Sequence, residues 1–222
     1  MKFELHAHTM ENDVCVNMPA DEIVRAYNNI GYDGIVITNH YFYWMFEWYK
    51  DEIEGLDHKG LIDLYLRGYR KAKKAGDEIG MTVLMGLELR FDGTINDYLV
   101  YGLDEDFLYN APVLNRMKLN SFLKIMPENA LIYQAHPFRD EMDITDPWKL
   151  HGIEVYNGGT DKRRNDIADL WADTHGLKKI SGSDFHRIEH LGRGGVIFEK
   201  RPTTSEDLVK LLKEEQYSLI RS

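Results

Sequence analysis

Several features that mark particular classes of protein are scarce in this chain of 222 residues. Cys15 is the only cysteine, which excludes an intrachain disulfide and favours a reducing compartment. No apolar stretch approaches the length of a membrane-spanning helix, and the N-terminus lacks the basic and apolar regions of a signal peptide. Together these absences predict a cytoplasmic protein.

Positive charge is also in deficit, with 27 basic against 37 acidic residues and a formal net charge of −10. This balance argues against a long nucleic acid or an anionic membrane as a partner, because the overall field of the chain would repel both. It does not exclude a small anionic substrate, since bound metal ions can reverse the field locally. The oligomeric state is not indicated by the sequence.

Short apolar runs alternate with amphipathic ones along the chain, and no linker, repeat or low-complexity tract interrupts them. This alternation predicts βα units around a largely parallel sheet that is buried on both faces. The expected strands are 2–5, 34–38, 81–89, 98–102, 130–136, 152–157, 178–186 and 194–198, and the expected helices are 20–31, 61–76, 112–126, 163–176 and 203–216. Thr203 and Glu206 have the spacing of a capping box at the start of the last helix.

About seven such units without a break favour a closed or nearly closed barrel over an open sheet. No G-x-G-x-x-G follows the first strand, which removes the main reason to expect a dinucleotide-binding fold. We therefore predict an α/β fold, a TIM-like (β/α) barrel that forms a single domain over residues 1–222. In such a barrel the chemistry is carried by residues at the carboxyl ends of the strands.

Histidines and carboxylates lie where the expected strands end. His6 and His8 close the first strand, and residues two apart on a strand point to the same face. Asp184 and His186 repeat this spacing near the other end of the chain. Other strand ends carry His40, Glu88, His136, Glu154 and Asn157. Because these ends share one rim, we expect a site for zinc, manganese or iron, which take imidazole and carboxylate ligands.

Individual members of this set have simpler interpretations. A single strand-end histidine such as His40 or His136 often only hydrogen-bonds a loop, and Glu88 alone could pair with an arginine. Their common position at one end of the strands favours the metal site. The remaining histidines lie outside strand ends or inside helical segments and are expected to be solvated; they are His58, His151, His175 and His190, the last being near the site.

Five features in order resemble the motifs of the PHP family, which is named for bacterial DNA polymerase domains and histidinol phosphatase. They are HAHT (6–9), ITNH (37–40), the strand-end Glu88, AHPFR (135–139) and GSDFH (182–186). The resemblance spans essentially the whole chain. It implies a distorted seven-stranded (β/α) barrel, metal-dependent phosphoesterase activity and two or three divalent metal ions.

The resemblance also implies a set of metal ligands. One ion would be held by His6, His8, Glu88 and Asp184. Glu88 would bridge to a second ion that is also bound by His136. A third ion would be bound by Asp13, His40 and His186.

Two positions depart from the family pattern. Asn39 stands where the family usually has an aspartate, which removes a carboxylate that could orient a ligand. No histidine occurs in 89–135, although many members have one there at the start of a short strand. Asp97 is the best candidate to replace it, or Tyr98 if the register shifts by one residue. As a ligand Asp97 would favour manganese or iron, and the alternative is a turn residue before a strand.

A cluster of divalent ions lowers the pKa of a bridging water and offsets charge on phosphoryl oxygens during in-line attack. Arg139 in HPFR and Arg193 in LGRGG are candidates to bind the phosphate in a bidentate manner, and a structural salt bridge is the alternative for each. The glycines of LGRGG allow either a close approach to a ligand or a turn. The aromatic segment 41–49 either packs on the barrel or forms a lid over the substrate.

The sequence thus predicts a metal-dependent hydrolase of phosphomonoesters or small phosphodiesters, acting on a small phosphorylated substrate. The alternative is a degenerate PHP module that binds metal for structure or interaction without catalysis. Degeneration should remove ligands, and nearly all of them are present.

Overall fold

Ten strands form one continuous sheet in the computed structural model, which describes all 222 residues. Their order is β10-β9-β1-β2-β4-β5-β6-β7-β8, with β3 alongside β4. The strands are β1 (Lys2–Ala7), β2 (Gly34–Ile37), β3 (His40–Tyr41), β4 (Thr82–Arg90), β5 (Asp97–Tyr101), β6 (Leu131–Gln134), β7 (Gly152–Asn157), β8 (Lys178–Gly182), β9 (Gly194–Phe198) and β10 (Tyr217–Arg221).

The sheet curves until β1 and the end of β8 meet. Ala7 forms a parallel bridge with Phe185, just beyond β8, and the Phe185 amide donates to the His6 carbonyl at 3.2 Å. This contact nearly closes the barrel, as expected. The predicted number of seven strands is wrong, however, because β3, β9 and β10 join the sheet beside the path from β1 to β8. The beginning of β1 pairs with β9 through Lys2 and Phe3, whereas its last residue, Ala7, bridges to Phe185. The sheet therefore branches at β1.

The sheet is also less parallel than expected. β5 runs antiparallel to both of its neighbours, β4 and β6. Its first residue, Asp97, therefore lies opposite Arg90 at the carboxyl end of β4. This reversal places the beginning of β5, rather than its end, at the rim formed by the carboxyl ends of the parallel strands.

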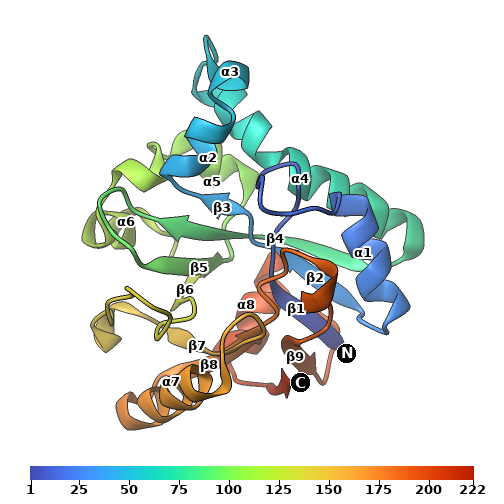
Figure 1. The fold of residues 1–222 in the computed structure, drawn as a ribbon, viewed down its shortest axis with the longest axis vertical. Coiled ribbons are helices and arrows are strands. Elements are labelled where there is room, and N and C mark those ends of the chain that lie inside the picture. The colour runs from blue at the N-terminus through green and yellow to red at the C-terminus, as the bar shows by residue number, and fades with distance from the viewer.

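The helices cover the outside of the sheet. Figure 1 shows α1 and α4 side by side, α7 at the opposite end, and α2 and α3 projecting above the rest of the chain. The helices are α1 (Ala20–Asn29), α2 (Tyr43–Trp48), α3 (Lys50–Ile53), α4 (His58–Ile79), α5 (Glu105–Asn110), α6 (Leu119–Ile125), α7 (Lys162–His175) and α8 (Ser205–Lys213), with single 3₁₀ turns at Leu114–Arg116, Pro147–Lys149 and Ile188–His190. None of them is both long and apolar enough to cross a membrane.

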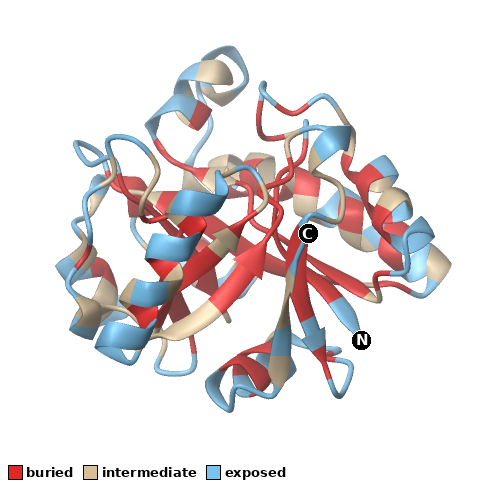
Figure 2. Cartoon of the chain, turned by 60° about the horizontal axis from the view of Figure 1, so that its bottom comes forward, coloured by how far each residue is buried: buried red, intermediate tan, exposed pale blue.

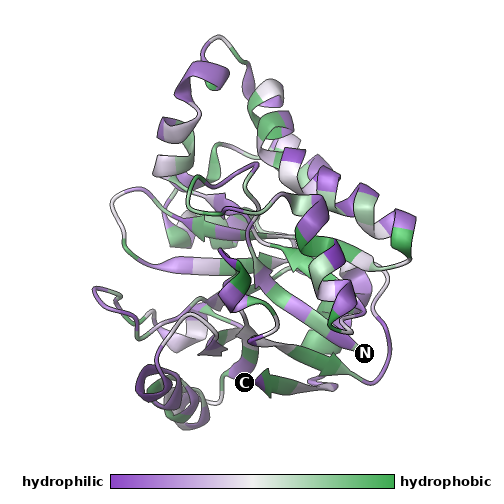
Figure 3. Cartoon of the chain, turned by 45° about the vertical axis from the view of Figure 1, so that its right-hand side comes forward, coloured by the Kyte–Doolittle hydropathy of each residue, from purple (hydrophilic) through white to green (hydrophobic).

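Burial follows the division between strands and helices. Figure 2 shows buried residues concentrated on the strands and exposed ones on the outer faces of the helices. In Figure 3, hydrophobic and hydrophilic residues alternate around the helices, as expected for helices that pack one face on a sheet. The longest helix, α4, is capped at its N-terminus by Asp57, whose side chain accepts from the Gly60 amide, and at its C-terminus by Gly80 in a left-handed conformation.

Two expected details of the helices are wrong. The segment 112–126 is not one helix, because a 3₁₀ turn and α6 occupy separate parts of it. The capping box of α8 is formed by Thr204 and Asp207 rather than by Thr203 and Glu206. The hydrogen bonds explain the shift by one residue, since the Asp207 carboxylate accepts from the backbone amides of both threonines.

Candidate metal centre

Three acidic or histidine residues alternate along β1 and its end. Glu4, His6 and His8 are two residues apart, so their side chains share one face of the strand, and all three are fully buried. The opposite face carries Phe3, Leu5 and Ala7, which join the apolar core. The alternation along β1 therefore separates a polar interior from a hydrophobic layer within a single strand.

Glu88, near the carboxyl end of β4, lies at the centre of the polar interior. Its Oε2 atom is 3.3 Å from His6 Nε2, 3.2 Å from His8 Nε2 and 2.9 Å from His40 Nε2. Its Oε1 atom is 3.0 Å from His136 Nε2. Four imidazoles from three segments thus meet at one carboxylate that is 1% exposed.

Asp184 faces Glu88 across the two histidines of β1. Its Oδ1 atom lies 3.5 Å from His6 Nε2 and 3.3 Å from His8 Nε2. The backbone of Asp184 is left-handed, with φ of 52°, which is uncommon for a residue other than glycine. His6, His8, Glu88 and Asp184 form one compact group, with the same members that the resemblance implied.

A second group consists of Glu88, Asp97 and His136. His136 Nε2 lies 3.8 Å from Asp97 Oδ2, and the Asp97 carboxylate also accepts two hydrogen bonds from the Arg90 guanidinium, at 2.6 and 2.5 Å. The neighbouring Tyr98 turns away, since its hydroxyl pairs with Thr145 Oγ1 at 2.9 Å. The register therefore places Asp97, not Tyr98, beside His136, and its role as a ligand stays a prediction.

A third group contains His8, Asp13, His40 and His186. Asp13 Oδ2 lies 2.7 Å from His40 Nδ1 and 3.5 Å from His186 Nε2. The rings of His8 and His40 stack with centroids 4.2 Å apart. His8 thus lies between this group and the first one, a position that the resemblance did not assign to it.

The three groups offer the donors that a divalent cation requires. Within each group one ligand atom per residue lies within 4.8 Å of all the others. The buried atoms of these residues without a hydrogen-bond partner are His6 Nε2, His8 Nδ1 and Nε2, Glu88 Oε2 and His136 Nδ1. A buried polar atom without a partner is costly, and a cation would satisfy the unpaired atoms that face Glu88 and Asp184. The residues therefore fit zinc, manganese or iron.

Charges within the centre shift the pKa values of its members. Burial opposes ionisation of Glu88, yet His6 and His40 hold the pKa of this carboxyl well below its usual range. Burial likewise opposes charge on His40, but Glu88 and Asp13 raise its pKa to about 9. The pKa of His186 rises to about 11 against burial, through Asp13 and Asp184. Without metal, protons on His40 and His186 thus offset part of the carboxylate charge.

Asn39, the residue that departs from the family pattern, has a defined structural role. Its Oδ1 atom accepts from the Thr9 amide at 2.8 Å, and its Nδ2 atom donates to Asn12 Oδ1 at 3.0 Å. Asn12 in turn donates to the Tyr65 carbonyl. Asn39 therefore holds the loop that follows His8, because it binds the backbone amide of Thr9. Its hydrogen bond to Asn12 Oδ1 requires an amide, since a carboxylate has no proton to donate.

The two candidate arginines lie in different surroundings. Arg139 Nη2 donates to Asp184 Oδ2 at 2.6 Å and to Asn157 Oδ1 at 3.2 Å. Arg193 is exposed and reaches the Gly158 carbonyl at 3.4 Å. It lines a cavity of about 520 Å³ that contains no member of the three groups. The structure thus brings Arg139, but not Arg193, to the metal centre.

The glycines of LGRGG are explained by packing. A Cβ atom on Gly194 would lie 2.2 Å from the Gly182 backbone, and one on Gly195 would lie 2.3 Å from the Phe3 carbonyl. Gly195 also has φ of 125°, which side chains rarely allow. Both glycines let β9 approach its neighbouring strands closely. The glycines of LGRGG are therefore explained by the turn that leads into β9 and by the packing of that strand.

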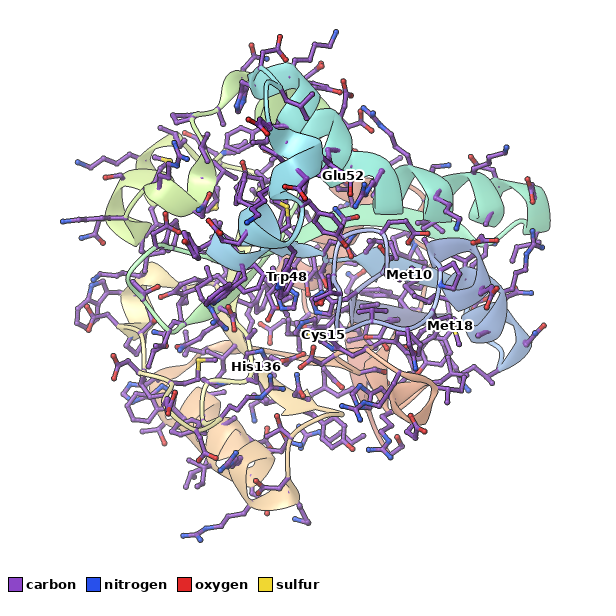
Figure 4. All side chains as sticks on the ribbon, turned by 45° about the horizontal axis from the view of Figure 1, so that its top comes forward. Met10, Cys15, Met18, Trp48, Glu52 and His136 are labelled. Carbon is purple, nitrogen blue, oxygen red and sulfur yellow. The ribbon has the colours of Figure 1, made fainter.

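The aromatic segment 41–49 is divided between the core and the surface. Tyr41 is buried, and the Phe42 ring lies 4.8 Å from the His40 ring. Tyr43 and Trp44 on α2 are 50% and 55% exposed. Figure 4 labels Trp48 and Glu52 on the α2–α3 segment, Met10 and Cys15 on the loop after β1, and His136. The segment therefore packs partly on the barrel and also borders the centre.

The four histidines predicted to be solvated are not members of the three groups. His58 Nε2 pairs with the Leu108 carbonyl, and the His175 ring lies 4.0 Å from Trp171. His151 Nδ1 accepts from the Ile132 amide. His190 is nearest, since its Nδ1 atom lies 2.9 Å from the Asp184 carbonyl.

Two more buried carboxylates lie against the centre; Glu4 was not singled out from the sequence, and Glu154 was named there only as a strand-end residue. Glu4 accepts hydrogen bonds from the His6 and Ser183 amides and from the Tyr27 hydroxyl, and burial raises its pKa to about 7. Glu154 on β7 contacts His6 directly. The sequence contained a sign of both roles, because each is an acidic residue inside a largely apolar strand. The strand of Glu4 also leads to the ligands His6 and His8.

Known proteins share part of the sequence and the fold of this chain. A family model described as PHP-associated matches residues 162–217, which include Asp184 and His186. No curated protein matches the sequence. One similar solved structure is a two-domain protein from Bacteroides vulgatus that contains a predicted PHP-like metal-dependent phosphoesterase, with a TM-score of 0.70 and 17% identity. The alignment covers 100% of this chain and 64% of that one, so the chain spans less than two thirds of that relative.

The chain has a PHP fold. The resemblance carried by its sequence motifs is thereby confirmed. Two further structures are similar over nearly the whole chain. PsfC from Pseudomonas syringae has a TM-score of 0.66 and 16% identity, covering 100% of this chain and 91% of that one. Endonuclease Q, solved with a 27-mer duplex that has an abasic lesion at the active site, has a TM-score of 0.61 and 15% identity, covering 96% of this chain and 56% of that one. At these low identities the structural similarity shows the fold alone, and the activity of this chain must be inferred from its own residues.

Proposed function

We propose that this PHP protein is a metal-dependent hydrolase of phosphate esters, a phosphomonoesterase or a phosphodiesterase for small substrates. The observation that carries the proposal is the convergence of three His and carboxylate groups on the single carboxylate of Glu88. The ions proposed are two or three of zinc, manganese or iron. The name of the Bacteroides vulgatus relative, a PHP-like metal-dependent phosphoesterase, agrees with this class of reaction.

Divalent ions at these groups would activate a water molecule and offset negative charge on a phosphoryl group. The chain would hold them through imidazole and carboxylate atoms that already face one another. Glu88 presents one oxygen to each side, so it is suited to bridge neighbouring ions. Asp184 and Asp13 supply oxygen donors to the first and third groups.

Arg139 is the cationic side chain placed to bind the substrate phosphate. Its hydrogen bonds to Asp184 and Asn157 both use Nη2, which leaves Nη1 and Nε free to donate to an anion. The side chain is 34% exposed, so it is partly open to solvent. A fixed guanidinium can donate two parallel hydrogen bonds to a phosphoryl group.

A small phosphorylated substrate fits the overall charge. A net charge of −10 disfavours binding of a long nucleic-acid backbone, because the overall field repels it. Endonuclease Q, in contrast, was solved with a duplex, so an oligonucleotide is a necessary comparison in any test. Tyr43 and Trp44, which directly follow Phe42, have exposed rings that would suit a substrate with a planar ring.

The test is a screen of phosphate esters with manganese, zinc or iron added to chelator-treated protein. The panel contains p-nitrophenyl phosphate, sugar phosphates, mononucleotides, dinucleotides and a duplex oligonucleotide. We expect hydrolysis of a small ester that requires metal and that Asp184→Ala reduces more than about 100-fold while the fold is retained. No hydrolysis of any ester with any metal would instead support a degenerate PHP module, and cleavage of the duplex alone would exclude a small substrate.

A further inference from the structure

Glu154 is an acidic residue in the middle of β7, and both of its carboxylate oxygens form hydrogen bonds with neighbouring residues. It is 1% exposed, and the residues on either side of it, Ile153 and Val155, belong to the hydrophobic core. Its Oε1 atom lies 2.9 Å from His6 Nδ1. Its Oε2 atom accepts from the His136 backbone amide at 3.0 Å and from Asn157 Nδ2 at 2.8 Å.

We propose that Glu154 is a positioning residue that aligns two metal ligands, His6 and His136, which contact different oxygens of Glu88. The inference rests on the proposed metal site and assigns to Glu154 a function that is separate from binding the ions themselves. Glu154 does not belong to any of the three ligand groups. It acts on the ions through the two histidines that it contacts.

The contact with His6 determines which ring nitrogen faces the centre. A carboxylate accepts a hydrogen bond, so in the neutral imidazole, the form that binds a metal, His6 Nδ1 carries the proton and Nε2 keeps its electron pair. His6 Nε2 is the buried nitrogen without a hydrogen-bond partner, 3.3 Å from Glu88 and 3.5 Å from Asp184. Glu154 therefore selects the tautomer of His6 that can bind a cation between these carboxylates.

The contact with His136 holds its backbone. His136 has φ of 29°, a conformation that residues other than glycine rarely adopt. The hydrogen bond from its amide to Glu154 Oε2 fixes this conformation where β6 has ended. In that position the ring reaches Glu88 Oε1 at 3.0 Å through Nε2. One carboxylate thus sets the orientation of one ligand and the backbone of another.

Asn157 extends this network to the substrate side. Its Nδ2 atom donates to Glu154 Oε2 and, at 3.3 Å, to Asp184 Oδ2, while its Oδ1 atom accepts from Arg139. Glu154 is therefore connected through one amide to a proposed ligand and to the proposed phosphate-binding arginine. A carboxylate that served only to stabilise the barrel would have no need of these specific partners.

The experiment compares the chain with its Glu154→Gln variant, which keeps the size of the side chain but removes the charge. Metal-free protein is titrated with Mn²⁺ and with Zn²⁺ by calorimetry, and folding is followed by circular dichroism and thermal unfolding. We expect the affinity for the ions at the His6 and His136 groups to fall roughly 10- to 100-fold. Ser181→Ala is the control, because Ser181 is equally buried and bonds only to Ile220 and Gly195. It should lower the stability and leave the metal affinity unchanged.

A second measurement needs no variant. Long-range ¹H–¹⁵N spectra of the zinc-loaded protein report the tautomer of each histidine. We expect His6 to be protonated at Nδ1 and unprotonated at Nε2. A proton on Nε2, or a folded Glu154→Gln protein with unchanged affinity for both ions, would overturn the inference. Because both readouts concern metal binding, they remain decisive even if no phosphate ester is hydrolysed.

Discussion

The Nε2 atom of His40 lies 2.9 Å from the Oε2 atom of Glu88. The two residues are aligned on the paired strands β3 and β4, so backbone hydrogen bonds fix the distance between their side chains. Through this contact the third group of ligands meets the first at one carboxylate oxygen. The oxygens of Glu88 thereby connect all three groups, which makes this residue the most sensitive point of the centre.

Replacing Glu88 with glutamine should therefore disrupt more than one ion. We expect Glu88→Gln to lower both the number of bound metals and the hydrolytic rate, the latter by more than 100-fold, since loss of an outer partner of a ligand already costs about 10- to 100-fold. Metal content and kcat would be measured on the same sample. Glu78→Gln, on the exposed face of α4, is the control. A variant that keeps full metal content would show that Glu88 is not a bridge.

Arg139 and Arg193 should differ in their effect on catalysis. Arg139→Lys keeps the charge but loses the paired donors, and we expect kcat/KM to fall about 10- to 100-fold, because a hydrogen bond to a charged group contributes about 1.5–3 kcal/mol. Arg193→Lys should change it by less than threefold, since Arg193 lies outside the centre. Equal losses in both variants would mean that the substrate extends as far as Arg193.

Asn39→Asp, which restores the residue usual in the family, should destabilise this chain. A carboxylate cannot donate to Asn12 Oδ1, which would be left facing a negative charge in a buried site. We expect a loss of about 1–3 kcal/mol in the free energy of unfolding, measured by urea denaturation. Asn120→Asp on the exposed side of α6 should change it by less than about 0.5 kcal/mol. Unchanged stability of Asn39→Asp would contradict the role assigned to the Asn12 pair.

The metal-free protein should become less stable as the pH rises. The pKa of His40 is raised from 6.5 to about 9 against burial, through Glu88 and Asp13, so its protonation stabilises the folded state. This contribution is complete below pH 6.5 and is lost as the pH rises through about 9. We expect the Tm of chelator-treated protein to fall across this range and His40→Gln to reduce the slope.

Excess Mn²⁺ should reverse this trend, because a neutral imidazole binds the ion and metal affinity rises with pH. The comparison uses the same buffers with and without metal, followed by circular dichroism. A Tm that rises with pH in the absence of metal would show that the buried imidazoles are not charged.

Much of the centre was predictable because strand-end positions are visible in a sequence. The pair His6–His8 follows the period of a strand, and parallel strands bring their carboxyl ends to one rim. Asp184 and His186 have the same spacing in the sequence, but β8 ends at Gly182, so the predicted strand 178–186 was too long at its carboxyl end. The direction of β5 was not predictable, since antiparallel pairing depends on contacts between distant segments. Whether Asp97 or Tyr98 faces His136 depends on the register of β5 with β4, which the sequence does not show.

Other features depended on packing that short patterns do not encode. The two-residue strand β3 and the strand β10 carry too little periodicity to be predicted, so the strand number was wrong. Arg193 follows the GSDFH motif closely in sequence, yet the turn before β9 directs it to a cavity that contains none of the candidate metal ligands. The partners of Glu154 could not be predicted, because His6 is 148 residues away along the chain.

Metal analysis tests the central claim most directly. Protein purified without chelator and then dialysed would be measured for zinc, manganese and iron by mass spectrometry against protein concentration. The three ligand groups predict two or three equivalents of divalent metal per chain, falling in the Glu88→Gln variant. Less than one equivalent per chain, unchanged by that substitution, would contradict the assignment of these side chains as a metal centre.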